Sequence, residues 1–243
     1  DRGAQEGYGI HFLHALRGES RDGSDAVEAI DTNADGVVSL LEAHQRARAA
    51  SSSLDVPITT SEVFLRAAVD DEQPAPEGLR PAPLPEERAL VAALADRLGL
   101  DDPAQAHERR EAMLARIDAL TDRLDAVETE LEDAQTALAS ELLHRWPVLD
   151  DPWRDDFSAT LQNEREAIEA HLQTSSIAAR VLTLEEERDL VGAEHDDLLV
   201  EAAPFERLER ALETLALAAR LQAEGDRLWL RYLGFLACER GEP

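Results

Sequence analysis

A heptad seam between Met113 and Leu138 is the feature that most constrains the fold of this 243-residue chain. Apolar residues recur there in alternating steps of four and three, at Met113, Ile117, Leu120, Leu124, Val127, Leu131, Ala134 and Leu138. Such a repeat places one apolar stripe along a long helix, and a second helix must cover that stripe. We therefore predict a coiled-coil hairpin or helical bundle in which Leu124 and Leu131 are buried.

The composition favours helix throughout the chain. Hydrophobic residues make up 44% of the sequence and are mainly Ala and Leu, whereas aromatic residues make up only 4%, so we expect helices packed by aliphatic side chains. Before the seam we predict short helices around residues 10–16, 24–31, 39–50, 59–69 and 85–100. Gly18 should end the first, and Thr59 with Glu62 has the spacing of a capping box.

A Pro-rich stretch divides the chain. Residues 70–85 read DDEQPAPEGLRPAPLP, which is typical of an extended linker. We therefore predict a first domain over residues 1–69 and a helical domain over residues 86–243. Within the second, Pro147 and Pro152 predict a turn, followed by helical stretches over 156–192 and 203–240, with Pro204 in the first turn of the last helix.

The charge excludes some partners. The formal net charge is −28, and all 24 basic residues are Arg. Nucleic-acid backbones require a basic face, so we expect no nucleic-acid partner. No apolar run is long enough to cross a membrane, and no signal sequence is visible, so we expect no membrane span. The compartment, cytoplasmic or exported, stays open.

Residues 31–42, DTNADGVVSLLE, have the spacing of an EF-hand calcium loop. Asp31, Asn33 and Asp35 stand at positions one, three and five, and Gly36 stands where the loop must turn sharply. The remaining ligands would be the Val37 carbonyl, Ser39 directly or through water, and both carboxylate oxygens of Glu42. Hard oxygen ligands on a flexible loop suit Ca²⁺ better than Mg²⁺, so we predict Ca²⁺ as the cofactor and Val38 packed beneath the loop.

The loop has no partner loop elsewhere in the sequence. Sensor EF-hands act in pairs that open a groove, and neither DRGAQ nor RDGSDAVE keeps the required spacing. We therefore expect a structural calcium ion that fixes local structure, with a calcium switch as the alternative.

No complete active site is visible. His11 and His14 share a helix face, but the acidic residue of a zinc-peptidase motif does not follow, and we expect at least one of them in a core or boundary position. We expect His44, His107, His144, His171 and His195 on the surface. The single cysteine, Cys238, cannot form an internal disulfide and is expected to be a small buried hydrophobe.

The run GYGIHFLHALRGESRDGSDAVEAIDTNADGVVSLLEAHQRA resembles the C-terminal end of bacterial caspase-like and legumain-like cysteine peptidases. The resemblance is carried by Gly9, Phe12, Leu13, Ala15, Leu16, Arg17 and Gly18, and then by residues 31–43. It covers about the first fifth of the chain. Those peptidases place a short helix after the last strands of an α/β core, and a calcium-loop-like segment often follows.

The resemblance implies a function for the chain as part of a hydrolase. The His and Cys dyad of such peptidases lies on earlier strands, and neither can be placed on a residue here. The chain would be the C-terminal, small-subunit fragment, beginning at Asp1 after a cleavage site or a disordered loop and completing the α/β core of an N-terminal catalytic subunit. The helical domain would then be an appendage that receives a protein substrate or regulator. The alternative is a non-enzymatic, calcium-stabilised helical interaction protein.

Overall fold

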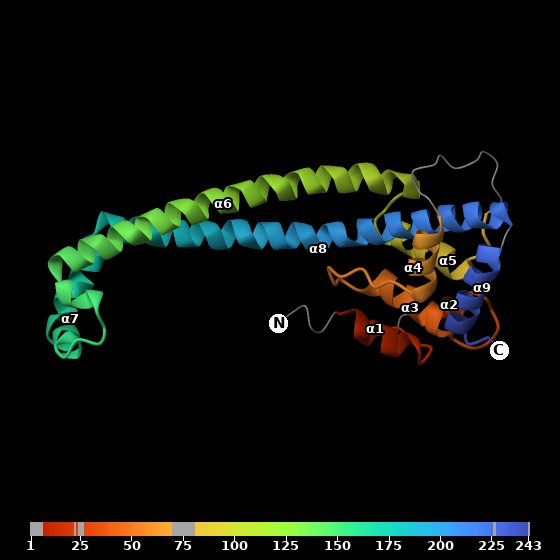
Figure 1. Ribbon diagram of the computed structural model, residues 1–243, viewed down its shortest axis with the longest axis horizontal. Helices are drawn as coiled ribbons and strands as arrows, with labels where there is room; N and C mark the ends of the chain where they lie inside the picture. Colours follow the sequence, from red (N-terminus) through yellow and green to blue (C-terminus); the bar gives the residue numbers. More distant parts are fainter. Residues whose placement is uncertain (1–6, 22, 24–26, 70–80, 226, 243) are drawn as a thin grey trace. The chain divides into compact units, whose positions relative to one another are not determined.

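The computed structural model describes the chain except for residues 1–6, 22, 24–26, 70–80, 226 and 243 (Figure 1). The described residues are mostly α-helical, and none of them lies in a β-strand. The prediction of a mainly α fold with a helical bundle is therefore confirmed, whereas the described residues contain no α/β core. Attachment to a caspase-like core stays a prediction.

The chain divides into two compact units. Unit 1 comprises Asp1–Leu114 and Leu199–Pro243, and unit 2 comprises Ala115–Leu198. This division differs from the predicted domains of residues 1–69 and 86–243, because residues on both sides of the predicted linker share the core of unit 1.

Unit 1 is built from short helices and from parts of two long ones (Figure 1). The elements wholly within it are α1 (Tyr8–Ala15), α2 (Val27–Ile30), α3 (Leu40–Ala50), α4 (Thr60–Ala68), α5 (Pro85–Arg97), the short 3₁₀ helix η1 (Pro103–Gln105) and α9 (Arg227–Arg240). It also contains the start of α6 (Ala106–Arg145) and the end of α8 (Ser176–Glu224). Gly18, at a φ of 74°, follows α1 as predicted.

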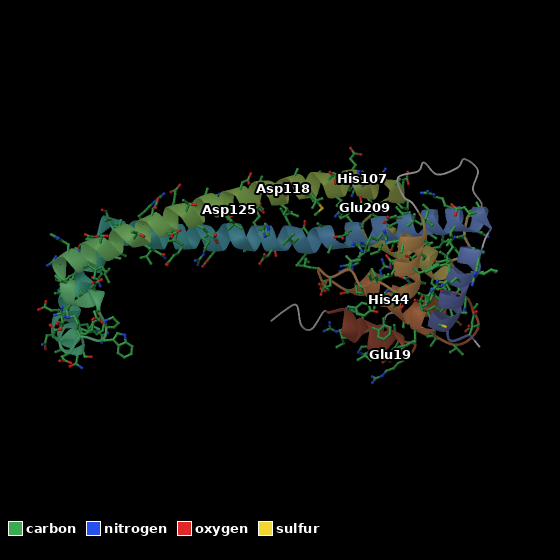
Figure 2. The ribbon with its side chains drawn as sticks, in the orientation of Figure 1. Glu19, His44, His107, Asp118, Asp125 and Glu209 are labelled. Atoms are coloured by element: carbon green, nitrogen blue, oxygen red, sulfur yellow. The ribbon has the colours of Figure 1, made fainter. Side chains whose placement is uncertain are left out.

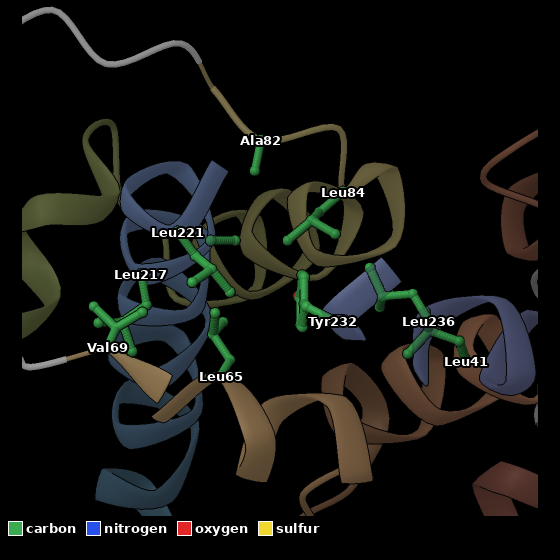
Figure 3. Close-up of a cluster of buried hydrophobic side chains, with 10 residues drawn as sticks. Leu41, Leu65, Val69, Ala82, Leu84, Leu217, Leu221, Tyr232 and Leu236 are labelled. Atoms are coloured by element: carbon green, nitrogen blue, oxygen red, sulfur yellow. The ribbon is translucent and has the colours of Figure 1, made fainter. Parts of the chain in front are cut away.

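Aliphatic side chains form the core of unit 1. In the cluster of Figure 3, Leu65 of α4 packs with Leu221 of α8 and with Tyr232 and Leu236 of α9. A second cluster joins α5 to the end of α8. Burial of this kind stabilises a fold by about 25 cal/mol per Å² of apolar surface, which explains why residues from distant parts of the sequence form one unit.

The predicted linker is only partly described. Residues 70–80 lie outside the described part of the chain. Beyond them, Ala82 and Leu84 are buried in the cluster of Figure 3. The last residues of the Pro-rich stretch therefore pack in the core.

Helix α4 begins where the sequence predicted. The Thr59 hydroxyl accepts a hydrogen bond from the Glu62 backbone N–H at 3.2 Å. The Glu62 carboxylate does not complete a capping box; it lies 3.5 Å from Arg48 and 3.3 Å from Arg66. A buried cation is the stronger partner for that carboxylate, because charge-assisted hydrogen bonds exceed neutral ones.

The boundaries of α8 differ from the prediction. The expected helix over 156–192 is interrupted at Ser175, whose hydroxyl accepts hydrogen bonds from the Ile177 and Ala178 N–H groups. The prediction that Pro204 opens the last helix was wrong, because Pro204 lies inside α8. An internal proline costs about 3 kcal/mol relative to alanine, and the buried Phe205 and Leu208 beside it offset that loss. The helical stretch ends at Gly225, and α9 follows.

Unit 2 contains the predicted hairpin. Helices α6 and α8 run antiparallel within it, joined through the 3₁₀ helix η2 (Pro147–Asp150) and α7 (Phe157–Thr174) (Figure 1). Val127 and Leu131 of the seam pack with Val181 and Leu184 of α8. The heptad prediction is therefore confirmed in this unit, and so is the predicted turn after Arg145.

Ion pairs across the hairpin set its register. Arg116 pairs with Glu194, Arg123 with Glu187, and Arg180 with Glu130. From one ion pair to the next, the residue on α6 lies seven positions further along the chain and the residue on α8 lies seven positions earlier. This is the spacing of flanking charges in an antiparallel coiled coil.

Leu124 departs from the predicted burial. Leu131 is only 5% exposed, as predicted, but Leu124 is half-buried. On α8, Arg188 stands at the spacing of the apolar stripe, four residues after the buried Leu184 and three before the buried Val191, and its guanidinium bonds to Asp189 at the surface. The prediction for Leu124 was wrong because a charged residue interrupts the opposing stripe.

No helix among the described residues combines the length and the apolar character that crossing a membrane requires.

Candidate calcium loop

The predicted loop lies in unit 1 between α2 and α3. Gly36 has a φ of 87°, and Ala34 also adopts a positive φ, 59°. A left-handed backbone is accessible to glycine without steric strain, so Gly36 makes the turn for which the sequence singled it out.

Side-chain oxygens organise the first half of the loop. The Asp31 carboxylate accepts hydrogen bonds from the N–H groups of Asp35 at 3.1 Å and Gly36 at 2.8 Å. The Asp35 carboxylate accepts from the Val37 N–H at 2.8 Å, and Asn33 Oδ1 accepts from the Asp35 N–H at 2.9 Å. The loop therefore curls around its own oxygen atoms.

Glu42 closes the loop from the first turn of α3. Its Oε1 accepts hydrogen bonds from the N–H groups of Thr32 at 2.7 Å and Asn33 at 3.1 Å. Its Oε2 accepts from the Ser39 N–H and hydroxyl, both at 2.9 Å, and Ser39 in turn caps the helix. The side chain is only 1% exposed, so this carboxylate holds both ends of the loop.

The residues beneath the loop pack as predicted. Val38 contacts a small cluster of Ala15, Ile30 and Ala43, whereas the Val37 side chain points to solvent. The cluster ties α1, α2 and α3 together around the loop.

The six predicted ligand residues offer the type of donor atom that calcium prefers. Asp31, Asn33, Asp35, Val37, Ser39 and Glu42 supply carboxylate, amide, hydroxyl and carbonyl oxygens, which are the donors that Ca²⁺ takes. Within the described part of the chain, no three His, Cys, Asp or Glu side chains are placed to hold a metal ion together. The carboxylates instead accept hydrogen bonds from backbone N–H groups. Calcium binding would require Glu42 to give up these hydrogen bonds in favour of the ion.

Two predictions outside the loop were wrong. His44 is 7% exposed, because α3 is covered along most of its length and the Tyr8 hydroxyl shares a hydrogen bond of 2.6 Å with His44 Nδ1. Cys238, expected in the core, is exposed on α9. His107, in contrast, lies on the surface as predicted, 2.9 Å from Glu209 (Figure 2). His11 and His14 are partly buried, which agrees with a boundary position.

Unit 1 also contains a buried ionic cluster that no sequence pattern indicated. Arg48 is fully buried, and its guanidinium lies 3.5 Å from both Glu62 and Glu87. Gln45 also donates a hydrogen bond to Glu87, and Glu86 pairs with Arg240 at 2.6 Å. Burial raises the pKa of the Glu87 carboxyl to about 7, although Arg48 opposes the shift. No local spacing marks these residues, because their partners come from α3, α4, α5 and α9.

Comparisons with family models, with curated proteins and with solved structures found no match to this chain.

Proposed function

We propose that this chain is the non-catalytic, C-terminal part of a calcium-binding cysteine peptidase of the caspase-like class. The observation that supports this function is the exposed face of α1, the helix that carries the resemblance. Leu13 is 60% exposed and Ile10 38% exposed, whereas Ala15 on the opposite side is buried. A short helix that is apolar on both sides is expected where another polypeptide covers the outer side.

The proposed partner is the catalytic subunit that bears the His and Cys dyad. It would pack on α1, the counterpart of the helix that follows the last strands of the core in the peptidases that the sequence resembles. The helical hairpin would remain available for a protein substrate or regulator.

Co-expression tests this partnership. The chain is co-expressed with the polypeptide encoded upstream of it and recovered through a tag on the chain. We expect a complex with a His- and Cys-bearing polypeptide, and we expect Leu13→Glu to abolish it. Leu182→Glu places the same charge on an exposed position of α8 and should leave the complex intact. An upstream polypeptide without such a dyad, or equal effects of both variants, would refute the proposal.

The proposed role of calcium is structural. Without an ion, Asp31, Asp35 and Glu42 place three carboxylates in one loop, and their repulsion opposes the fold. Calcium would offset most of this negative charge and join α2 to α3. An ion that binds only the folded form stabilises it by roughly 2.7 kcal/mol at a hundredfold excess over Kd.

Thermal unfolding with calcium and with chelator tests this role. We expect calcium to raise the Tm of the unmodified chain and of Asp55→Asn, which changes an exposed carboxylate outside the loop. Glu42→Gln should lose most of the gain, because a neutral amide cannot act as a bidentate anionic ligand. Equal calcium shifts in Glu42→Gln and the unmodified chain would show that the loop is an acidic turn without a metal.

The hairpin of unit 2 favours a second candidate, a non-enzymatic interaction protein. Its helices have their own apolar seam and three cross-helix ion pairs. Sedimentation of the isolated chain separates the two candidates. A monodisperse oligomer supports the interaction protein, whereas aggregation that Leu13→Glu suppresses supports a missing catalytic partner.

A further inference from the structure

A pocket of about 470 Å³ lies in unit 1 beside the end of the calcium loop, and none of the six proposed calcium ligands lines it. It is bounded by α1, α3, α9 and the segment that leads into α4. Its walls include Tyr8, Phe12, Leu40, Ile58, Phe235 and Cys238. This volume is within the range of small-molecule sites, which are mostly apolar with a few polar groups.

The apolar part of the wall is rich in rings. Tyr8 and Phe12 stack with centroids 5.7 Å apart, and Phe235 lines the same pocket from α9. Leu40 and Ile58 are about half exposed, so apolar surface remains accessible. An apolar molecule entering the pocket would remove this surface from water, which is favourable.

The polar groups of the wall are largely engaged within the protein. The Tyr8 hydroxyl and His44 Nδ1 share a hydrogen bond of 2.6 Å. The other imidazole nitrogen, Nε2, is buried, so a molecule in the pocket does not reach it. An apolar ligand would therefore displace none of these contacts.

The charges around the pocket disfavour ions. Both Glu239 carboxylate oxygens accept hydrogen bonds from Ser61, at 2.8 and 2.6 Å, so this carboxylate is not free to hold a cation. The net charge of −28 repels anions. An uncharged ligand meets neither obstacle.

We propose that this pocket binds a small, uncharged, mainly apolar organic molecule. The proposal does not rest on the peptidase partnership or on calcium, because neither Ile10 and Leu13 of the proposed partner face nor any of the six proposed calcium ligands lines the pocket. Cys238, the only cysteine of the chain, lies in the wall and is exposed, so its rate of alkylation reports occupancy.

The test measures alkylation of Cys238 by N-ethylmaleimide on the full chain, with increasing concentrations of acetophenone or ethylbenzene. The two molecules are similar in shape and differ in the ketone oxygen. We expect saturable protection by both molecules, since each would cover the apolar wall of the pocket. Absence of protection would overturn the proposal.

Two matched variants locate the protection. Ile58→Asp places a charge in the pocket wall, whereas Leu54→Asp changes an equally exposed aliphatic residue that does not line it. We expect Ile58→Asp to raise the protecting concentration of acetophenone about tenfold, as a loss of about 1.4 kcal/mol would, and Leu54→Asp to leave it unchanged. Equal behaviour of the two variants would place the ligand elsewhere and overturn the proposal.

Discussion

Glu87 shows how a single buried carboxyl can make a fold sensitive to pH. Its side chain faces Arg48 of α3, Glu62 and Arg66 of α4, and Glu86 of its own helix. The raised pKa means that the folded state binds a proton more readily than the unfolded state does. The protonated Glu87 carboxyl therefore contributes to the free energy of unfolding in full below about pH 4.5, and this contribution is lost as the pH rises to about 7.

Glu87→Gln should remove that contribution. A shift from 4.5 to about 7 corresponds to about 3 kcal/mol, and the neutral amide cannot titrate. We expect urea unfolding between pH 5 and 8 to show a weaker loss of stability with rising pH in Glu87→Gln than in the unmodified chain. Glu108→Gln, an exposed change on α6, should follow the unmodified chain. Parallel curves for all three would mean that Glu87 is ionised throughout this range.

The sequence predicts the surroundings of a single residue only where neighbours in the chain determine them. Gly36 turns the loop and Ser39 caps α3 within a few residues of each other. The environments of His44 and Cys238 depend on helices distant in the sequence, which a local pattern does not identify.

The helices of unit 2 follow from the heptad pattern because each has one apolar stripe. The ion pairs at heptad spacing then fix which residues face each other. The break at Ser175 escaped prediction because apolar residues continue on both sides of it, and only the hydroxyl hydrogen bonds reveal the helix start.

Leu131→Ala should destabilise the hairpin. Leu131 is buried in the seam, and truncation of a buried leucine costs about 2–5 kcal/mol when the site cannot collapse. Leu182→Ala is a matched control, because Leu182 lies in the same hairpin but is 67% exposed. We expect its effect to stay within about 0.5 kcal/mol. Chemical denaturation measures both, and similar losses would show that the seam is not the core of the hairpin.

The whole molecule has far more acidic than basic side chains. Repulsion among 52 acidic residues, balanced by only 24 arginines, opposes every compact arrangement of the chain. The mainly helical character could be predicted from composition and periodicity. The grouping of residues 199–243 with residues 1–114 could not, because it depends on contacts between buried residues such as Leu208 and Leu90.

Salt should therefore stabilise the chain. Raising NaCl from about 0.05 M to about 0.5 M shortens the Debye length severalfold, which weakens the net repulsion more than it weakens exposed ion pairs worth about 0.2–1 kcal/mol each. We expect the urea midpoint to rise, with chelator present so that no divalent ion contributes. A midpoint that falls with NaCl would show that the ion pairs outweigh the repulsion.

If the loop binds calcium as proposed, the hydrogen bonds of Glu42 would limit the speed of uptake. The carboxylate would have to release the N–H groups of Thr32, Asn33 and Ser39 before it could reach an ion, so only the fraction of molecules with a released carboxylate would be competent to bind. The association rate would then level off at high calcium, at the rate at which those hydrogen bonds open. Such a loop would follow the sustained calcium level around the protein and ignore pulses shorter than the opening time.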